Sequence, residues 1–297
     1  KYCNLYIDQF IDYKTVNNLV DFNDVILKVA DNNFTSDRIP NFELLIIDEA
    51  QDLSLLLWKF IRKFINNARI TYLAGDDDQS IMRDSSFKSL LNLKTSEKDI
   101  VLAETKRIPK EIKKYLDNGI IKVLNKNKNR KEKEWLSRKS GGDIKLSHNI
   151  HYSITELVTD VEYDIHESNE IDYKSDWLIM APTKNTGIKI SEIFKNINIP
   201  HFYRNKSILN ASKYKSIIKV QTIHMSKGEE ANNVAIVFAS LYDIQMVIND
   251  IKLAYVALTR SKKILYPSVL LKGLNKDKIP TLFNEIFLPN LINNHKQ

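Results

Sequence analysis

The chain has 297 residues, of which 43% are hydrophobic and 27% charged, and its formal net charge is +7. This composition is typical of a folded globular protein, and it excludes a disordered or collagen-like chain, while the length suggests two domains. No apolar run approaches the roughly 18 residues of a membrane-spanning helix. The single cysteine, Cys3, excludes a disulfide framework or a cysteine-based zinc site, which favours a cytoplasmic protein.

Glycine is scarce, and its positions exclude one common nucleotide site. None of the seven glycines is followed by lysine, so the sequence lacks the G-x-x-x-x-G-K-[ST] loop whose backbone amides hold nucleotide phosphates. The sequence also begins with Lys1 rather than methionine. We therefore expect it to be part of a longer protein.

The positive charge is concentrated in one stretch. Residues 1–107 have a net charge of −3, residues 108–145 of +7 and residues 146–297 of +3, and residues 122–133 are rich in lysine and asparagine. Two interpretations stay open for this stretch: a solvated helix end and loop, or a surface that contacts a polyanion such as nucleic acid.

Short apolar runs alternate with amphipathic stretches from about residue 40 onward, which is typical of an α/β protein with a parallel sheet. Residues 1–38 are expected to be mostly helical, with 21–29 as the clearest helix. Up to the basic stretch, hydrophobic periodicity predicts strands at 43–48, 70–75 and 100–103, and helices over 53–64 and 109–122. Beyond it, the same patterns predict strands at 143–147, 177–181, 217–223, 233–239 and 263–267, and helices over 153–167, 184–196 and 243–262. Two α/β units would join near residues 107–125, with Gly141 and Gly142 as the clearest flexible joint.

Two adjacent carboxylates follow the first predicted strand. Asp48 and Glu49 stand at its carboxyl end, where open α/β sheets present groups to ligands. One carboxylate there can hold Mg²⁺ while the other polarises an attacking water. The second strand ends in an acidic loop that contains Gln79, so parallel strands would place Glu49 and Gln79 at one crevice. Glutamine can hydrogen-bond a γ-phosphate or the attacking water without adding charge.

Five segments of the chain form a recognisable series. Residues 48–52 (DEAQD) and 73–81 (LAGDDDQSI) resemble motifs II and III of the UvrD/Rep-like superfamily 1 DNA helicases. Residues 105–107 (TKR) stand at the position of motif IV, residues 220–230 (VQTIHMSKGEE) resemble motif V, and residues 255–261 (YVALTRS) resemble motif VI. Five motifs in the family's order are far more specific than any one of them.

The resemblance implies a role for each matching residue at the nucleotide. Asp48 would bind Mg²⁺, Glu49 would act on the hydrolytic water, and Gln79 would couple the γ-phosphate to the DNA-binding surface. Arg107 and Arg260, the latter on the helix over 243–262, would converge on the γ-phosphate.

Other matching positions complete the two ligand surfaces that the resemblance implies. Glu230 would hydrogen-bond the ribose, and Gly228 and Lys106 would also lie at the nucleotide. Thr222 and His224 would touch the DNA backbone. The segment after motif III, where the family has a base-stacking aromatic element, offers Arg83 and Phe87 as DNA contacts.

The sequence departs from the family in several places. The motif I loop is absent, Lys106 replaces the tyrosine that would stack on adenine, and only residues 205–219 lie where longer relatives insert an accessory domain. Motif V also has Glu229 and Ala231 where leucine and phenylalanine are usual. Without the motif I loop, these residues alone would hydrolyse ATP hardly at all.

The resemblance therefore implies an α/β fold with two RecA-like parallel-sheet lobes. The first, residues 1–107, would be truncated at its N-terminus, and the second, residues 108–297, would have an absent or minimal accessory domain. The implied function is that of a part of an ATP-dependent 3′→5′ DNA helicase or translocase, with ATP and Mg²⁺ as cofactors. Single-stranded DNA or a single-strand/double-strand junction would be its partner, and the missing N-terminal part of the same protein would supply motif I. The alternative is a degenerate helicase-like module that binds nucleic acid or a partner protein without hydrolysing ATP.

Overall fold

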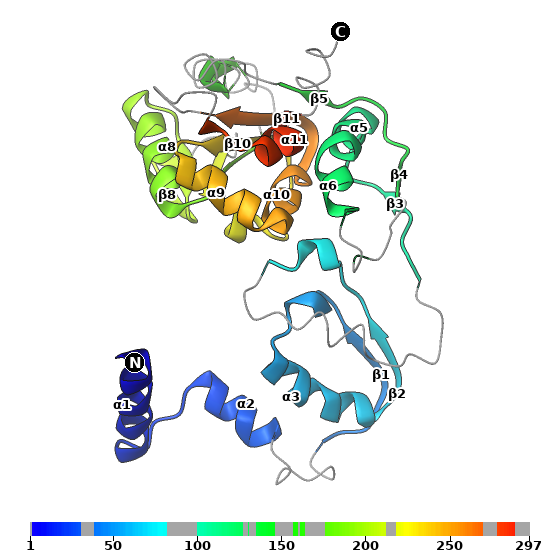
Figure 1. The fold of residues 1–297 in the computed structure, drawn as a ribbon, viewed down its shortest axis with the longest axis vertical. Helices are drawn as coiled ribbons and strands as arrows, with labels where there is room; N and C mark the ends of the chain where they lie inside the picture. Colours follow the sequence, from blue (N-terminus) through cyan, green and yellow to red (C-terminus); the bar gives the residue numbers. More distant parts are fainter. Residues whose placement is uncertain are drawn as a thin grey trace. The chain divides into compact units, whose positions relative to one another are not determined.

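The protein is described here by a computed structural model, in which the chain forms two compact units, Lys1–Glu97 and Lys98–Gln297 (Figure 1). The boundary lies earlier in the chain than the expected one after residue 107. Each unit is described by itself. The described residues are 2–30, 39–81, 100–126, 130, 135–145, 157–159, 161–163, 176–211, 218–269 and 278–288.

The first unit consists of two helices followed by a parallel β-α-β segment (Figure 1). Its elements are α1 (Tyr2–Val16), α2 (Phe22–Ala30), β1 (Phe42–Ile47), α3 (Leu55–Asn66) and β2 (Ala68–Leu73). Strands β1 and β2 pair in parallel, which confirms the strands expected at 43–48 and 70–75 and the helix between them, with slightly shifted ends. Helix α3 begins where Ser54 accepts a hydrogen bond from the backbone N–H of Leu57.

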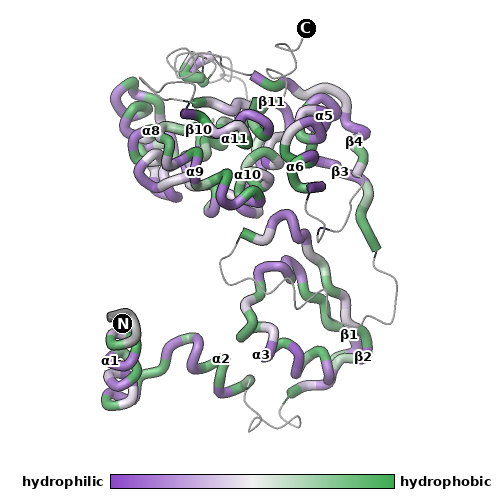
Figure 2. Tube along the Cα trace, in the orientation of Figure 1, coloured by the Kyte–Doolittle hydropathy of each residue, from purple (hydrophilic) through white to green (hydrophobic). Residues whose placement is uncertain are grey.

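One face of the β1–β2 sheet is covered and the other is not. Helix α3 alternates hydrophobic and hydrophilic residues (Figure 2), and its Trp58 packs against Ile47 and Ala50. On the other face lie four exposed apolar side chains, which pair across the two strands: Leu44, Ile46, Ile70 and Tyr72. Parallel sheets are ordinarily buried on both faces, so this apolar face is an unusual surface among the described residues.

The second unit is built on a seven-stranded sheet with the order β5-β11-β10-β6-β9-β7-β8. All neighbouring strands are parallel except β7 and β8. This large, mostly parallel sheet confirms the α/β fold class and is the sheet type expected of a RecA-like lobe. The strands are β5 (Asp143–Ile144), β6 (Trp177–Ala181), β7 (His201–Tyr203), β8 (Lys206–Ile208), β9 (Ile218–Thr222), β10 (Ala231–Phe238) and β11 (Ser261–Val269).

The helices of the second unit follow the strands in α/β order. Among the described residues they include α5 (Lys110–Leu116), the π-helical turn η4 (Asp117–Ile121), α6 (Lys122–Leu124), α8 (Lys184–Asn196), the 3-10 turn η7 (Ile223–Ser226), α9 (Leu241–Asn249), α10 (Ile251–Leu258) and α11 (Thr281–Phe287). The buried carboxylate of Asp243 accepts hydrogen bonds from the hydroxyls of Thr183 and Thr186, at 2.9 and 2.7 Å, and so joins the starts of α8 and α9. The core of the sheet includes Trp177, Ile179, Val220, Ala235 and Tyr266.

Three expectations for the second unit are wrong. Residues 100–103 form no strand; the short strand β3 (Glu104–Thr105) follows them and pairs with β4 (Leu136–Ser137). The single helix expected over 243–262 is two helices, because Asp250 leaves helical geometry and its side chain caps α10 by accepting from the N–H of Lys252. Gly142 lies within the second unit, where a Cβ would stand 2.8 Å from Cβ of Pro109, so it is a site of close packing.

Two other expected elements lie partly outside the described residues. The helix over 153–167 is described at 157–159 and 161–163, which are helical, and the strand over 143–147 is described as far as residue 145. The helix from 109 to 122 is present as α5, η4 and α6 in succession. No helix among the described residues is long and apolar enough to cross a membrane.

His201 is a fully buried histidine whose two ring nitrogens are both hydrogen-bonded. Nε2 lies 2.7 Å from Oγ of Ser191, and Nδ1 lies 2.8 Å from the carbonyl oxygen of Ile199. Burial lowers the pKa of His201 below its ordinary value of 6.5, because charge is costly away from water. The ring therefore stays neutral in the folded protein at pH values where it takes up a proton in the unfolded chain.

This difference predicts that acid destabilises the second unit. Below about pH 6.5 the unfolded state binds more protons than the folded state, so the free energy of unfolding falls as pH falls, by about 1.4 kcal/mol for each unit by which the pKa is lowered. Urea unfolding at pH 7.5 and 5.5 measures the loss, and His201→Gln is expected to diminish it. The exposed His224 provides the control, since His224→Gln should leave the loss intact. Equal acid sensitivity of the wild type and His201→Gln would refute the assignment.

Candidate functional site

The first group of candidate residues follows the carboxyl end of β1. Asp48 comes directly after Ile47, the last residue of the strand, and its Oδ1 accepts a 2.8 Å hydrogen bond from the N–H of Glu49. Glu49 has a left-handed backbone with φ of 50° and precedes the 3-10 turn η2 (Ala50–Asp52). A non-glycine residue with positive φ is uncommon, and such strain clusters at functional sites.

A buried glutamine connects this loop to the loop after β2. Gln51 is fully buried; its Nε2 donates to Oε2 of Glu49, and its Oε1 accepts a 3.0 Å hydrogen bond from the N–H of Asp76. Oδ2 of Asp76 in turn accepts a 2.8 Å hydrogen bond from Nε2 of Gln79. The structure thus brings Glu49 and Gln79 to the same edge of the sheet, as the parallel strands predicted, and joins them by a chain of hydrogen bonds.

Gly75 makes this connection possible. A Cβ at this position would stand 2.7 Å from Oε1 of Gln51, closer than real Cβ contacts allow. The amide side chain of Gln51 occupies the space that any larger residue at position 75 would need. Glycine is therefore required here by a close approach rather than by backbone conformation.

Acidic side chains at this edge provide oxygen ligands of the kind that Mg²⁺ prefers. Asp76, Asp77 and Asp78 each place one carboxylate oxygen within 4.8 Å of the others. These three residues follow β2, as Asp48 follows β1. Carboxylates of the loops after both strands could therefore bind a cation at the carboxyl end of this sheet. The donor set fits a hard divalent cation.

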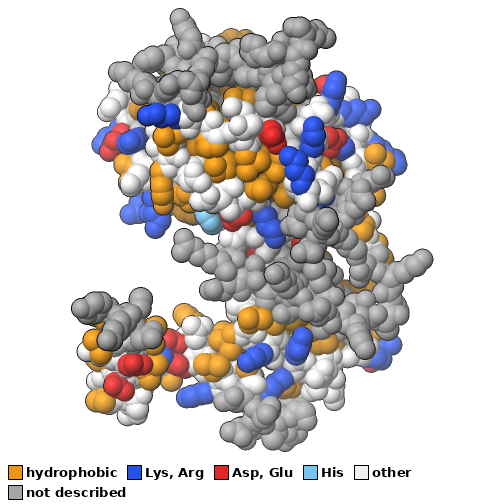
Figure 3. Space-filling view, viewed as in Figure 1, with side chains coloured by type: hydrophobic (Ala, Val, Ile, Leu, Met, Phe, Trp, Pro, Cys, Tyr) orange, Lys and Arg blue, Asp and Glu red, His pale blue; other side chains and the backbone are white. Residues whose placement is uncertain are grey.

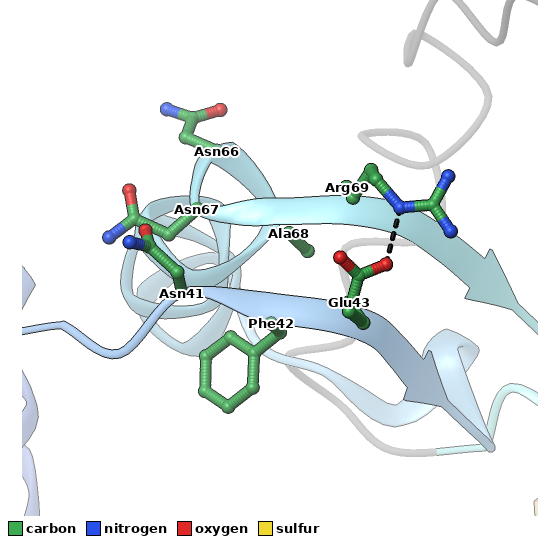
Figure 4. A pocket seen from close by; sticks show the side chains of 7 residues that line it. All are labelled: Asn41, Phe42, Glu43, Asn66, Asn67, Ala68 and Arg69. Carbon is green, nitrogen blue, oxygen red and sulfur yellow. Dashed lines mark hydrogen bonds and ion pairs between the residues drawn. The ribbon is translucent and has the colours of Figure 1, made fainter.

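A shallow pocket lies at the opposite ends of the same strands. It has a volume of about 370 Å³ and is lined by residues at the amino ends of β1 and β2, among them Asn41, Asn67 and Ala68 (Figure 4). An ion pair between Arg69 and Glu43 spans the two strands there. None of the candidate site residues lines this pocket, so it is separate from the acidic edge.

The second group of candidate residues is assembled within the second unit. Nε of Arg107 donates to Oε2 of Glu230 at 2.8 Å, and NH1 of Arg107 donates to the carbonyl oxygen of Thr259 at 3.2 Å. Nζ of Lys262 lies 3.2 Å from Oε1 of Glu230. Residues of three segments that are far apart in sequence, 105–107, 220–230 and 255–262, therefore meet at one place.

Glu230 is held as a carboxylate by its cationic neighbours. Partial burial opposes its ionisation, but the hydrogen bond and charge of Lys262, together with those of Arg107, hold the pKa of Glu230 below its ordinary value. Gly228, which precedes it, has φ of 81°, a conformation that favours glycine. Lys106 is directed elsewhere: its Nζ pairs with Glu104 at 2.7 Å.

Arg260 is buried, and it lies outside the helix on which the sequence pattern placed it. Its exposed fraction is 1%, and it lies between the end of α10 and the start of β11. Its Nε donates to the carbonyl oxygen of Val256 at 2.9 Å, and its NH1 donates to that of Glu229 at 3.3 Å. NH2 donates to Oγ1 of Thr259, the residue whose carbonyl oxygen accepts from Arg107, so both arginines contact Thr259.

Thr222 and His224 lie at the carboxyl ends of the strands of the seven-stranded sheet, opposite the end at which Glu230 lies. Thr222 ends β9, and its hydroxyl caps η7 by accepting from the N–H of Met225, whereas Glu230 directly precedes the start of β10. His224 is exposed on η7. The residues expected to contact DNA, Thr222 and His224, thus lie at the carboxyl ends of the strands. Glu230, expected to contact the nucleotide, lies at the amino ends of strands of the same sheet. Arg83 and Phe87 lie outside the described residues.

Three residues of these sites were not assigned roles from sequence. Gln51 and Asp76 form the connection between Glu49 and Gln79, and Thr259 joins the two arginines. All three stand inside the quoted motifs, so the signal was present. Their contacts are made across the fold and are not visible in local periodicity.

Comparison with known proteins relates the chain to helicases. Residues 2–98 match the family described as the UvrD/REP helicase N-terminal domain. An 85-residue segment is 29% identical to a probable DNA helicase II homolog of Mycoplasma genitalium, covering 26% of this chain and 12% of the relative. The chain is similar to DNA helicases. It spans only a small part of the length of that relative, and the match of the family covers residues close to those of the first unit.

Two solved structures are also similar, at low sequence identity. The helicase nonstructural protein 10 of an arterivirus has a TM-score of 0.42 and 12% identity, with 82% of this chain and 42% of that chain covered. The C-terminal domain of a possible DNA helicase from Lactobacillus plantarum WCFS1 has a TM-score of 0.38 and 13% identity, with 61% and 92% covered.

Proposed function

We propose that this chain is part of an ATP-dependent, UvrD-like DNA helicase or translocase that moves 3′→5′ along single-stranded DNA or at a single-strand/double-strand junction. The observation that carries the proposal is the hydrogen-bonded chain from Glu49 through Gln51 and Asp76 to Gln79 at the carboxyl ends of two parallel strands. The similarity of residues 2–98 to the UvrD/REP helicase N-terminal domain supports it. The two units would be the two RecA-like lobes of a cytoplasmic enzyme.

The roles follow from the chemistry of each side chain. Asp48, with the carboxylates that follow β2, would hold Mg²⁺, which supplies neutralisation of phosphate charge when bound. Glu49 would accept a proton from the attacking water, and Gln51 would fix the orientation of its carboxylate. Gln79 can hydrogen-bond a phosphate oxygen or the water without adding charge.

The second unit would also supply residues that bind a nucleotide. Arg107 is a third exposed and presents a planar guanidinium that matches phosphate geometry, while Glu230 would accept from the ribose. Gly228 and Lys106 would lie nearby. At the carboxyl ends of the strands of the second unit, Thr222 and His224 would contact the DNA backbone. Arg83 and Phe87 are further candidate DNA contacts.

One observation favours a second candidate, a helicase-like module that binds nucleic acid or a protein without hydrolysing ATP. The guanidinium of Arg260 is buried and bonded to two backbone carbonyls and a hydroxyl, an arrangement that a purely structural arginine would show. The absence of a phosphate-binding loop from these residues also favours it.

The test is ATP hydrolysis by the protein expressed from its complete gene. A helicase or translocase is expected to hydrolyse ATP in the presence of Mg²⁺ and to do so faster with single-stranded DNA. A strand-displacement assay then compares duplexes that carry a 3′ single-stranded tail with duplexes that carry a 5′ tail. Faster unwinding of the 3′-tailed duplex would indicate 3′→5′ movement. Nucleic-acid binding without any ATP hydrolysis would support the binding module instead.

A further inference from the structure

The helix formed by α5, η4 and α6 has one buried face and one basic face. Ile112, Tyr115, Leu116, Ile120 and Val123 are buried in the second unit. Lys110, Lys114 and Lys122 are exposed on the outside, with Asn118 between the last two. The basic stretch seen in the sequence is therefore in part an ordered, helical surface.

The π-helical turn aligns these lysines. In a regular α-helix, each step of four residues turns about 40° further around the axis, so Lys122 would drift away from Lys110 and Lys114. The turn at Asp117–Ile121 holds more residues per turn and offsets this drift. Successive positions of the stripe are then about 6 Å apart along the axis, on the order of the distance between neighbouring phosphates of an extended strand.

The three lysines differ from the other cations of this helix in their pairing. Lys113 pairs with Asp117, and Lys126 pairs with Glu285 at 3.1 Å. Among the described residues, neither Lys110, Lys114 nor Lys122 has an ion-pair partner, and one acidic side chain, Glu111, is exposed beside them. Figure 3 shows Lys and Arg side chains around α5 and α6, with some acidic side chains between them.

An aromatic side chain lies against the same helix. Nζ of Lys113 stands 5.3 Å from the ring centroid of Trp135, which is partly exposed. The other two tryptophans, Trp58 and Trp177, are buried. Trp135 is thus a natural fluorescent reporter of binding at this surface.

We propose that the outward face of α5, η4 and α6 binds the phosphodiester backbone of single-stranded nucleic acid through Lys110, Lys114 and Lys122. This rests on the proposed function for the identity of the partner, but it assigns a contact surface that none of the helicase motifs contains. Unpaired lysines on one helical face, four and eight residues apart, can neutralise phosphates of one strand without reading its sequence. The binding is expected to be independent of base sequence and strongly dependent on salt.

The experiment measures binding of labelled oligo(dT) of about 16 nucleotides by fluorescence anisotropy over a range of salt concentrations. The protein is expressed from its complete gene, and Lys110, Lys114 and Lys122 are replaced together by glutamine, which keeps helix propensity. Three lost phosphate contacts are expected to reduce the salt slope by about 2 and to weaken binding on the order of 100-fold at about 0.1 M salt. In the wild type, oligo(dT) is expected to change the tryptophan fluorescence, and Trp135→Phe should diminish that change.

A matched variant tests whether charge alone explains the effect. Lys189, Lys195 and Lys206 are exposed elsewhere on the second unit, and their joint replacement by glutamine should leave the salt slope unchanged. Equal slopes and affinities for the wild type and the α5–α6 variant would overturn the proposal while leaving the helicase function standing. If the wild type does not bind oligo(dT), both the proposed binding surface and the proposed helicase function are contradicted. If polyglutamate displaces oligo(dT) at equal charge, the surface binds acidic polypeptides and the nucleic-acid assignment is wrong.

Discussion

Replacing Glu49 by glutamine is expected to reduce DNA-stimulated ATP hydrolysis by about 100-fold or more, the usual contribution of a general base. The substitution keeps size and leaves an oxygen that can still accept from Nε2 of Gln51, so the loop should fold as before. Under the proposed function, the substitution removes the negative charge that would take up the proton of the attacking water. Steady-state ATP hydrolysis with saturating single-stranded DNA measures turnover, and ATP affinity should stay near that of the wild type.

A control carboxylate on the same strand sharpens the Glu49 experiment. Glu43 lies at the amino end of β1, where it pairs with Arg69 at the pocket remote from the acidic edge. Glu43→Gln should therefore leave turnover unchanged. Gln51→Leu should lower turnover while Glu49 remains, because it removes the group that orients the carboxylate. Full activity of Glu49→Gln would show that this residue is not the base.

Replacing Arg260 by methionine is expected to lower the free energy of unfolding of the second unit by about 2–4 kcal/mol. The guanidinium satisfies the carbonyls of Val256 and Glu229 and the hydroxyl of Thr259 in a buried place, and methionine fills similar volume without donating to them. Urea unfolding and hydrogen exchange of the β10 amides measure the loss.

Arg107 supplies the comparison for the Arg260 experiment. Its side chain is a third exposed and its partner Glu230 is more exposed still, so Arg107→Met should cost less than about 1 kcal/mol. Under the proposed function it should instead weaken ATP hydrolysis strongly. Wild-type stability of Arg260→Met would show that its buried bonds contribute little, and would favour a role at the phosphate over a structural one.

The hydrophobic pattern of the sequence was sufficient to predict a strand or helix where burial of one face alone determines the local structure. The apolar run before Asp48 predicted β1 with both ends shifted by one position, and the all-apolar residues 177–181 predicted β6. The same reasoning failed at residues 100–103, where apolar side chains are followed by a strand of only two residues, and at Asp250, whose capping hydrogen bond divides an apolar helical pattern in two. Hydrophobic periodicity indicates which residues are buried. It does not indicate where a polar side chain replaces a backbone group as a hydrogen-bond partner and ends a helix.

The residues of the candidate sites also differ in whether local sequence could group them. Asp48, Glu49 and Gln79 could be grouped from sequence because parallel strands end at a common edge. The bond from Arg107 to Glu230 spans 123 positions, and the burial of Arg260 depends on the carbonyl of Glu229, 31 positions away. Such contacts are set by the tertiary fold, so the sequence alone pointed to the residues but not to which of them are accessible.

The uncovered face of the β1–β2 sheet has a consequence for handling the protein. A pair of strands with exposed Leu44, Ile46, Ile70 and Tyr72 offers both an apolar surface and unpaired strand edges among the described residues, which is the combination that promotes aggregation. Solubility of the purified chain would then be limited by these few side chains rather than by its overall charge. Lysine at position 46 or 72 is the substitution that would counter it.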